Sequence, residues 1–291
     1  MATMNSSSLK QAGHRAAHRV ERAATGGWIE GLERWGYVAR GVLYIIMGSL
    51  ALQLAMGAGG QAADPLGALR LIARQPYGKV LLVAMVVGLA GYSLWGLVRA
   101  LFDPLNKGHN AKGLATRASY LVSAISYGVL IIPALQLLGI QVPGGRPSGN
   151  PRDITAQLMS KPYGLMLVYL FGLFWLVAGV AQFVTAYRTT FMRDLRTLKM
   201  SATERYWARV IGRIGYAARG VVYLMISLFV ARAASTANPQ QAQGFGGALL
   251  KLAQGPYGQL LLGLVAAGLV LFGIYSVLSA RWYTIDPAER G

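Results

Sequence analysis

Cysteine is absent from the 291 residues, and histidine occurs only three times. The lack of cysteine excludes disulfides, thiolate metal sites and cysteine nucleophiles. His14 and His18 stand four residues apart, but no third ligand accompanies them to complete a metal site. The sequence has no Ser/His/Asp grouping, phosphate-binding loop or paired carboxylates. We therefore expect no metal, no cofactor and no enzymatic activity.

Charged residues are also scarce. They make up 13% of the chain, whereas a soluble globular domain carries about a quarter. Hydrophobic residues make up 54%, and the mean hydropathy is +0.43, so the composition indicates a membrane protein. No Asp, Glu, Lys or His lies deep within a long apolar run. A proton relay or a cation-coupling carboxylate is therefore not expected.

Six stretches without a charged residue predict the membrane spans, since about 20 helical residues cross a bilayer core of roughly 30 Å. One of them, 220–231, is short, and it reaches spanning length if Arg219 and Arg232 extend their charged groups to opposite interfaces. The stretches are 41–63, 80–98, 118–145, 162–187, 220–231 and 252–280.

Basic residues outnumber acidic ones by 28 to 10, which gives a net charge of +18. Most of them precede the first span, follow the last, or lie in the second and fourth connections. By the positive-inside rule both termini are then cytoplasmic. Residues 1–35 lack the apolar core of a signal peptide, so we expect the first apolar run to be a true span. Topology and attraction to anionic headgroups account for the charge, and we expect no nucleic acid partner.

The chain repeats itself. The motif Gly36–Tyr44 returns nearly unchanged as Gly215–Tyr223, and a degenerate copy begins at Ser119. Each copy is followed by a Pro-Tyr-Gly tripeptide, so one repeat is predicted to be two helices. The predicted boundaries are 1–32 for a basic cytoplasmic N-terminal arm, 33–104, 113–191 and 212–287 for the three repeats, and 192–211 for a basic cytoplasmic linker.

Each repeat crosses the membrane twice, so all three copies point the same way. We therefore predict an all-α membrane protein with six transmembrane helices, arranged as three parallel two-helix repeats around a pseudo-threefold axis, with short interfacial helices on the outer face. A solenoid is the competing arrangement, but a closed bundle packs six helices in one bilayer more economically.

The repeated motif, the hinge pattern in Ala68–Gly78 and Ala248–Gly258, and the copy number resemble a bacterial family of integral membrane proteins. That family is built from three copies of a two-helix domain of unknown function. The resemblance covers roughly residues 33–287 and implies a six-helix fold in the bacterial inner (plasma) membrane, with no particular activity. The middle copy departs from the pattern, since Ser123 and Ala124 stand where the other copies have Arg-Gly.

Tyr and Arg side chains of the motif share one helical face. They either bind a lipid phosphate or another anion on the cytoplasmic side, or anchor the helix at the interface. One arginine also precedes the first helix of each repeat, and these three either form an anion-steering ring or fix the topology. The candidate anion- or lipid-binding residues are Arg34, Arg40, Arg117, Arg213, Arg219, Tyr37, Tyr44, Tyr120, Tyr127, Tyr216 and Tyr223.

The Pro-Tyr-Gly tripeptides are predicted to be hinges. The proline ends a short outer helix, the tyrosine lies at the headgroup level, and the glycine lets the chain turn into the second span. A re-entrant gate is the alternative. The hinge residues are Pro76, Tyr77, Gly78, Pro162, Tyr163, Gly164, Pro256, Tyr257 and Gly258, and the short helices before them are predicted at 66–75, 154–161 and 248–255.

Two functional hypotheses follow. The first is a non-catalytic membrane scaffold that binds anionic lipid headgroups or a membrane-protein partner through its basic cytoplasmic face. The second is a passive channel or facilitator for a small neutral or anionic solute along the bundle axis. A pathway requires polar side chains that converge on a wet axial cavity, and the candidates are Gln53, Gln136, Gln182 and Ser126.

Overall fold

The computed structural model describes residues 27–58, 63–103, 108–142 and 151–282. No strand occurs in these ranges. Six helices are long and apolar enough to cross a membrane, which confirms the six-helix fold class and makes the chain a multi-pass membrane protein. The spans are formed by α2 (Gly27–Ala55), α4 (Gly78–Phe102), α5 (Ala111–Val129) continued by α6 (Ile131–Leu137), α8 (Gly164–Arg188), α9 (Ala202–Ser235) and α11 (Gly258–Trp282).

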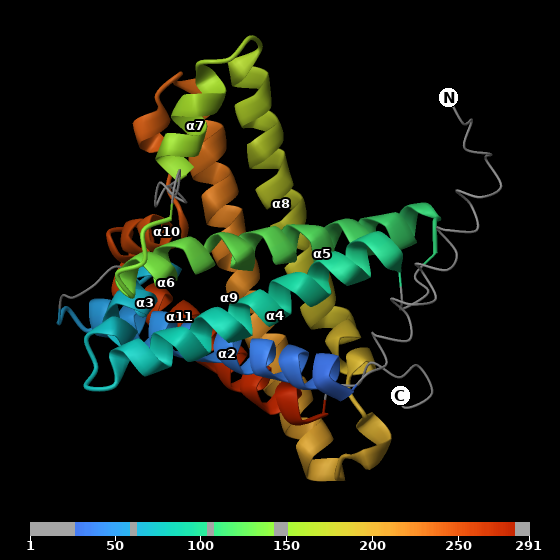
Figure 1. Ribbon diagram of the computed structural model, residues 1–291. Coiled ribbons are helices and arrows are strands. Elements are labelled where there is room, and N and C mark those ends of the chain that lie inside the picture. Colours follow the sequence, from blue (N-terminus) through green and yellow to red (C-terminus); the bar gives the residue numbers. More distant parts are fainter. Residues whose placement is uncertain (1–26, 59–62, 104–107, 143–150, 283–291) are drawn as a thin grey trace, which may run out of the picture.

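Packing between the long helices follows a cyclic order (Figure 1). Within the first and third repeats, α2 packs on α4 and α9 packs on α11. Between repeats, α11 packs on α2, α4 on α5, and α8 on α9. The contacts thus run in order around the three repeats, and Figure 1 shows α8 and α9 crossing α2, α4 and α5 at a steep angle. The ring is open at one place, between α5 and α8 of the middle repeat, which make almost no contact.

Glycine allows the first and last spans to approach closely. A Cβ atom at Gly273 would lie 2.6 Å from the Gly41 carbonyl oxygen, and one at Gly48 would lie 2.9 Å from that of Ala266. Such close backbone approach at small residues is how membrane helices gain packing energy, because lipid supplies no hydrophobic force between them. The most extensive contact of the bundle is therefore between α2 and α11.

Short helices precede three of the spans, as predicted. They are α3 (Pro65–Ala73), α7 (Pro151–Met159) and α10 (Phe245–Ala253). Ala68 and Leu69 of α3, and Ala248 and Leu249 of α10, are completely buried. These two helices therefore pack on the bundle as well as preceding the hinge.

The hinges work differently from the prediction. Each short helix ends three residues before its proline, and the residue with left-handed backbone is tyrosine in two copies, at Tyr163 (φ 60°) and Tyr257 (φ 54°). The following glycine begins the span. A Cβ atom at Gly78, Gly164 or Gly258 would collide with backbone carbonyl oxygens at the end of the preceding short helix. Close approach, rather than a positive φ, therefore requires glycine there.

The segment predicted as a cytoplasmic linker, 192–211, is folded. It includes the end of the 3₁₀ helix η1 (Thr190–Asp194) and all of η2 (Thr197–Lys199), and its last ten residues belong to α9. The Arg196 amide donates to the Trp282 carbonyl at 2.8 Å, and Leu195 is buried. This segment therefore covers the ends of α9 and α11. Of the predicted N-terminal arm, residues 1–26, with His14 and His18, lie outside the described residues.

Asp64 caps the N-terminus of α3, where the Gly67 amide donates to its carboxylate at 2.7 Å. Burial raises the pKa of this carboxyl. The fold therefore disfavours the ionised form, and stability falls as the pH rises from about 4 through the raised pKa. We expect Asp64→Asn to keep the cap and flatten this pH dependence, and Asp64→Ala to lose about 1 kcal/mol. Thermal unfolding in detergent at several pH values tests this, and identical pH profiles for wild type and Asp64→Asn would contradict it.

Candidate functional site

Arg40 lies inside the bundle, only 5% exposed. Its Nη1 donates to the Tyr92 hydroxyl at 2.8 Å and its Nε donates to the Ser276 hydroxyl at 3.2 Å. The guanidinium carbon also lies 4.5 Å from the centre of the Tyr37 ring. Its Nη2 is buried and has no hydrogen-bond partner. α2, α4 and α11 together thus enclose one cation and leave one of its donors unused.

Arg219 occupies the equivalent place in the third repeat and is 8% exposed. Its Nη2 donates to the Tyr223 hydroxyl at 2.6 Å, and its buried Nε has no hydrogen-bond partner. The rings of Phe272, Tyr44 and Tyr216 lie 4.4, 5.2 and 5.9 Å from the guanidinium carbon. The second cation is therefore also held among aromatic faces.

Phe272 of α11 links the two cations. Its ring centre lies 5.3 Å from the guanidinium carbon of Arg40 and 4.4 Å from that of Arg219, so the two carbons are less than about 10 Å apart. Among the described residues, no carboxylate lies within ion-pair distance of either arginine. We call Arg40, Arg219 and the rings of Tyr37, Tyr44, Tyr92, Tyr216, Tyr223 and Phe272 the arginine–aromatic cluster.

The energetics of this cluster favour an anion. Moving an isolated ion into a protein interior costs several kcal/mol even after relaxation. A desolvated cation–π contact returns about 2 kcal/mol, and a hydrogen bond to a charged group about 1.5–3 kcal/mol. These contacts offset the desolvation of Arg40 and Arg219, but no carboxylate among the described side chains neutralises the two positive charges.

Arg40 and Arg219 lie inside α2 and α9 rather than at the ends of these helices. Arg40 follows Glu33 by seven residues, or about 10 Å along the helix. Snorkelling to the interface requires an exposed charged group, which neither Arg40 nor Arg219 has. The interfacial-anchor interpretation therefore does not fit these two side chains, and anion binding by them stays a prediction.

The middle repeat contributes differently. Ser123, in place of arginine, supplies no cation, but Tyr127 reaches the cluster, since its ring centre lies 4.9 Å from that of Tyr92. Tyr120 instead lies beside Arg99, 4.7 Å from the guanidinium carbon to the ring centre. Arg99 forms a buried ion pair with Glu33, at 3.4 Å.

Two of the three arginines that precede the repeats bind helix ends. Arg117 donates to the carbonyls of Ala100 and Leu101, at 2.9 and 3.0 Å, and Arg213 donates to that of Tyr187 at 3.1 Å. Cations placed at C-terminal carbonyls stabilise a helix end. This arrangement fits a structural role for Arg117 and Arg213 better than an anion-steering ring. The third arginine, Arg34, is half-buried and directly follows Glu33 in the chain.

Sequence reasoning missed several residues of the site. Tyr92 and Phe272 belong to the cluster, and Ser276 accepts a hydrogen bond from Arg40. The buried ion pair Glu33–Arg99 was missed as well. One signal was available for two of them: Tyr92 and Phe272 each follow their hinge proline by sixteen residues, so they occupy the same place in two repeats.

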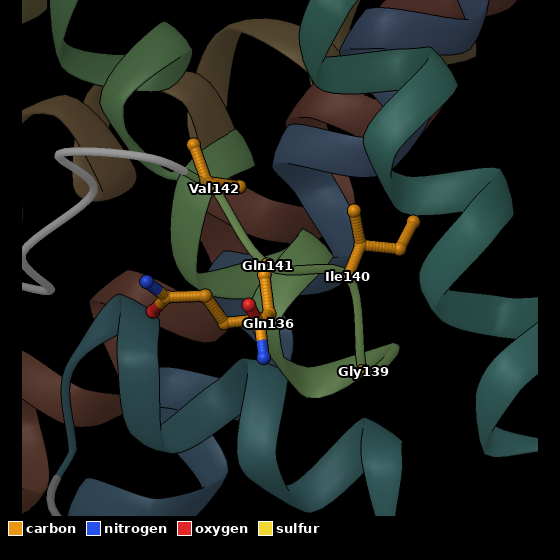
Figure 2. A pocket seen from close by; sticks show the side chains of 5 residues that line it. All are labelled: Gln136, Gly139, Ile140, Gln141 and Val142. Atoms are coloured by element: carbon orange, nitrogen blue, oxygen red, sulfur yellow. The ribbon is translucent and has the colours of Figure 1, made fainter.

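The polar side chains proposed to line an axial pathway do not converge. Gln53 and Ser126 are exposed. A surface depression of about 390 Å³ at the end of α6 contains Gln136, with Gly139, Ile140, Gln141 and Val142, and none of the other three candidates (Figure 2). Among the described residues, no cluster of three His, Asp or Glu side chains is placed to hold a metal ion.

Comparison with known proteins identifies the family. The model of the Domain of Unknown Function (DUF1206) matches three times, at residues 35–103, 118–189 and 214–283. The chain is 36% identical over 251 residues to the uncharacterized protein YxxB of Bacillus subtilis (strain 168), which covers 86% of this chain and 90% of that protein. No solved structure matches. With three tandem copies of the domain over most of its length, the chain belongs to the DUF1206 family of membrane proteins.

Proposed function

We propose that the protein is a non-catalytic membrane protein that binds the phosphate group of an anionic ligand, in the first place a phospholipid headgroup, at the arginine–aromatic cluster. One observation carries this proposal: two guanidinium groups are buried less than about 10 Å apart, each with an unpartnered N–H, and among the side chains that the structure describes no carboxylate forms an ion pair with either. Guanidinium groups recognise phosphate through paired, charge-assisted hydrogen bonds.

The setting of this function follows from the charge pattern. We place the protein in the bacterial inner membrane with both termini in the cytoplasm, so that its basic ends meet anionic lipid. Anionic lipid headgroups are the proposed partners, with a membrane protein as a further partner class and no role for nucleic acid. The polar side chains that a solute pathway along the axis would need do not come together among the described residues, and the Phe272 ring between the two arginines is fully buried.

Native mass spectrometry after gentle detergent purification tests the proposal. We expect the wild type to retain an anionic phospholipid and the variant Arg40→Gln/Arg219→Gln to lose it, with affinity lower by about tenfold or more, since charge-assisted hydrogen bonds disappear. The matched control Arg188→Gln/Arg232→Gln removes the same charge from two exposed arginines and should retain the lipid.

Titration of delipidated wild type keeps the test independent of the variants' folding. Short-chain phosphatidylglycerol should bind and short-chain phosphatidylcholine should bind less tightly, because only the first carries a net negative charge. Equal retention of lipid by both double variants, together with no preference in the titration, would reject the function.

A further inference from the structure

The middle repeat leaves one side of the bundle open. In the other two repeats the paired spans pack on each other, whereas α5 and α8 make almost no contact. In the most apolar window of α5–α6 only 17% of the residues are buried, and in α8 only 22%, against 44–50% in the four other spans. We call the gap between α5 and α8 the seam.

Each of the two helices that border the seam carries one ring that contacts the arginine–aromatic cluster. On its α5 side, Tyr127 contacts Tyr92, the tyrosine that accepts a hydrogen bond from Arg40. On its α8 side, the Trp175 ring lies 5.1 Å from that of Tyr223, the tyrosine that accepts from Arg219. The buried Trp175 indole N–H has no hydrogen-bond partner. Each helix of the seam thus supplies one ring next to a tyrosine that holds an arginine.

From the cytoplasmic side, both arginines are covered. Two turns before Arg40, Glu33 and Arg99 form an ion pair whose side chains are 0% and 6% exposed. Near Arg219, the Phe191 ring stacks on the Tyr216 ring with their centres 5.0 Å apart, and the Phe191 carbonyl accepts a hydrogen bond from the Tyr275 hydroxyl at 3.3 Å. A hydrated anion would have to displace these contacts to reach the cluster from water.

We propose that the seam is the lateral entrance through which a phospholipid reaches the cluster from the bilayer. The phosphate binds the unpartnered N–H groups of Arg40 and Arg219, and the acyl chains stay in the seam against apolar side chains such as Ile125 of α5 and Leu173 of α8, both more than half exposed. The inference rests on the proposed function and adds the source of the ligand. The occupant is a membrane lipid because, in a bilayer, the exposed apolar faces of α5 and α8 would contact hydrocarbon, which favours a molecule with apolar chains.

Photolabelling in lipid nanodiscs tests the entrance. A phosphatidylglycerol with a photoreactive group on one acyl chain is incorporated, and labelled peptides are mapped by mass spectrometry. We expect labelling to concentrate on α5 and α8, to fall to the level of the other lipid-facing helices in Arg40→Gln/Arg219→Gln, and to persist in Arg188→Gln/Arg232→Gln. Labelling that is even over all spans in the wild type would mean surrounding lipid only and would overturn the entrance.

A second measurement separates the two possible sources of phosphate. Inorganic phosphate and glycerol phosphate are titrated onto the delipidated protein, and we expect no arginine-dependent binding. If either binds as tightly as the lipid, the cluster is open to water and the seam is not its entrance, while the proposed function survives. If neither lipid nor free phosphate binds in an arginine-dependent way, the function and the entrance both fail.

Discussion

Replacing Glu33 with glutamine is expected to destabilise the protein by about 3–5 kcal/mol, the usual cost of removing one partner of a buried ion pair. The Glu33 carboxylate is fully buried and lies 3.4 Å from Nη1 of Arg99, which is itself almost fully buried. The substitution keeps the size of the side chain but leaves the Arg99 charge uncompensated inside the protein. Thermal unfolding in detergent, monitored by circular dichroism, measures the loss.

A double-mutant cycle identifies the ion pair as the cause. Arg99→Gln alone should also destabilise, and Glu33→Gln/Arg99→Gln should cost much less than the sum of the single changes, because no unpaired charge remains. Asp153→Asn, which neutralises an exposed carboxylate, is the control and should change stability little. Additive effects of the two single changes would show that Glu33 and Arg99 act independently.

Gly273→Ala is the second substitution with a large expected effect. Its Cβ atom would lie 2.6 Å from the Gly41 carbonyl oxygen and 2.7 Å from the Ile45 backbone nitrogen, so it would force α11 away from α2. Overpacking of this kind costs about 1–3 kcal/mol, and we expect the upper part of that range because backbone atoms cannot rotate away. The separation would also lengthen the Arg40–Ser276 hydrogen bond and weaken lipid retention.

Gly263→Ala provides the matched control on the same helix. Its nearest neighbour would be the Ala55 Cβ atom at 3.9 Å, an ordinary contact. Both substitutions gain the same intrinsic helix propensity, about 1 kcal/mol, so the difference between their unfolding midpoints isolates the contact between α2 and α11. Equal midpoints would mean that the two spans separate without cost.

Much of the architecture could be predicted from local patterns. Lipid forces the chain into helices of a fixed length, so charge-free stretches locate the six spans, including the one around 220–231. The repeated Pro-Tyr-Gly tripeptides likewise locate the short helices. The open side at α5 and α8 was not predicted, because sequence similarity between repeats implies similar packing, and nothing in 113–191 indicates which helix pairs fail to meet.

Only part of the candidate site could be predicted from the sequence. Helical spacing places Tyr37 and Arg40 on one face, but it does not tell which helix covers that face or how deeply. Arg40 donates a hydrogen bond to Ser276, which lies 236 residues later in the chain. α11, which carries Ser276, packs on α2 through glycine contacts that form only in the assembled bundle. The depth of both arginines depends on these partners, so their burial could not be read from their position beside a predicted span.

The extensive contact between the first and last spans has a consequence for biogenesis. α2 leaves the ribosome roughly 200 residues before α11 begins, which at 5–20 residues per second is about 10–40 s. During that interval the side of α2 that carries Gly41 and Gly48 lacks its partner helix α11, and Arg40 lacks its hydrogen-bond acceptor Ser276. The newly made chain is therefore most vulnerable to quality-control proteases until its final helix arrives.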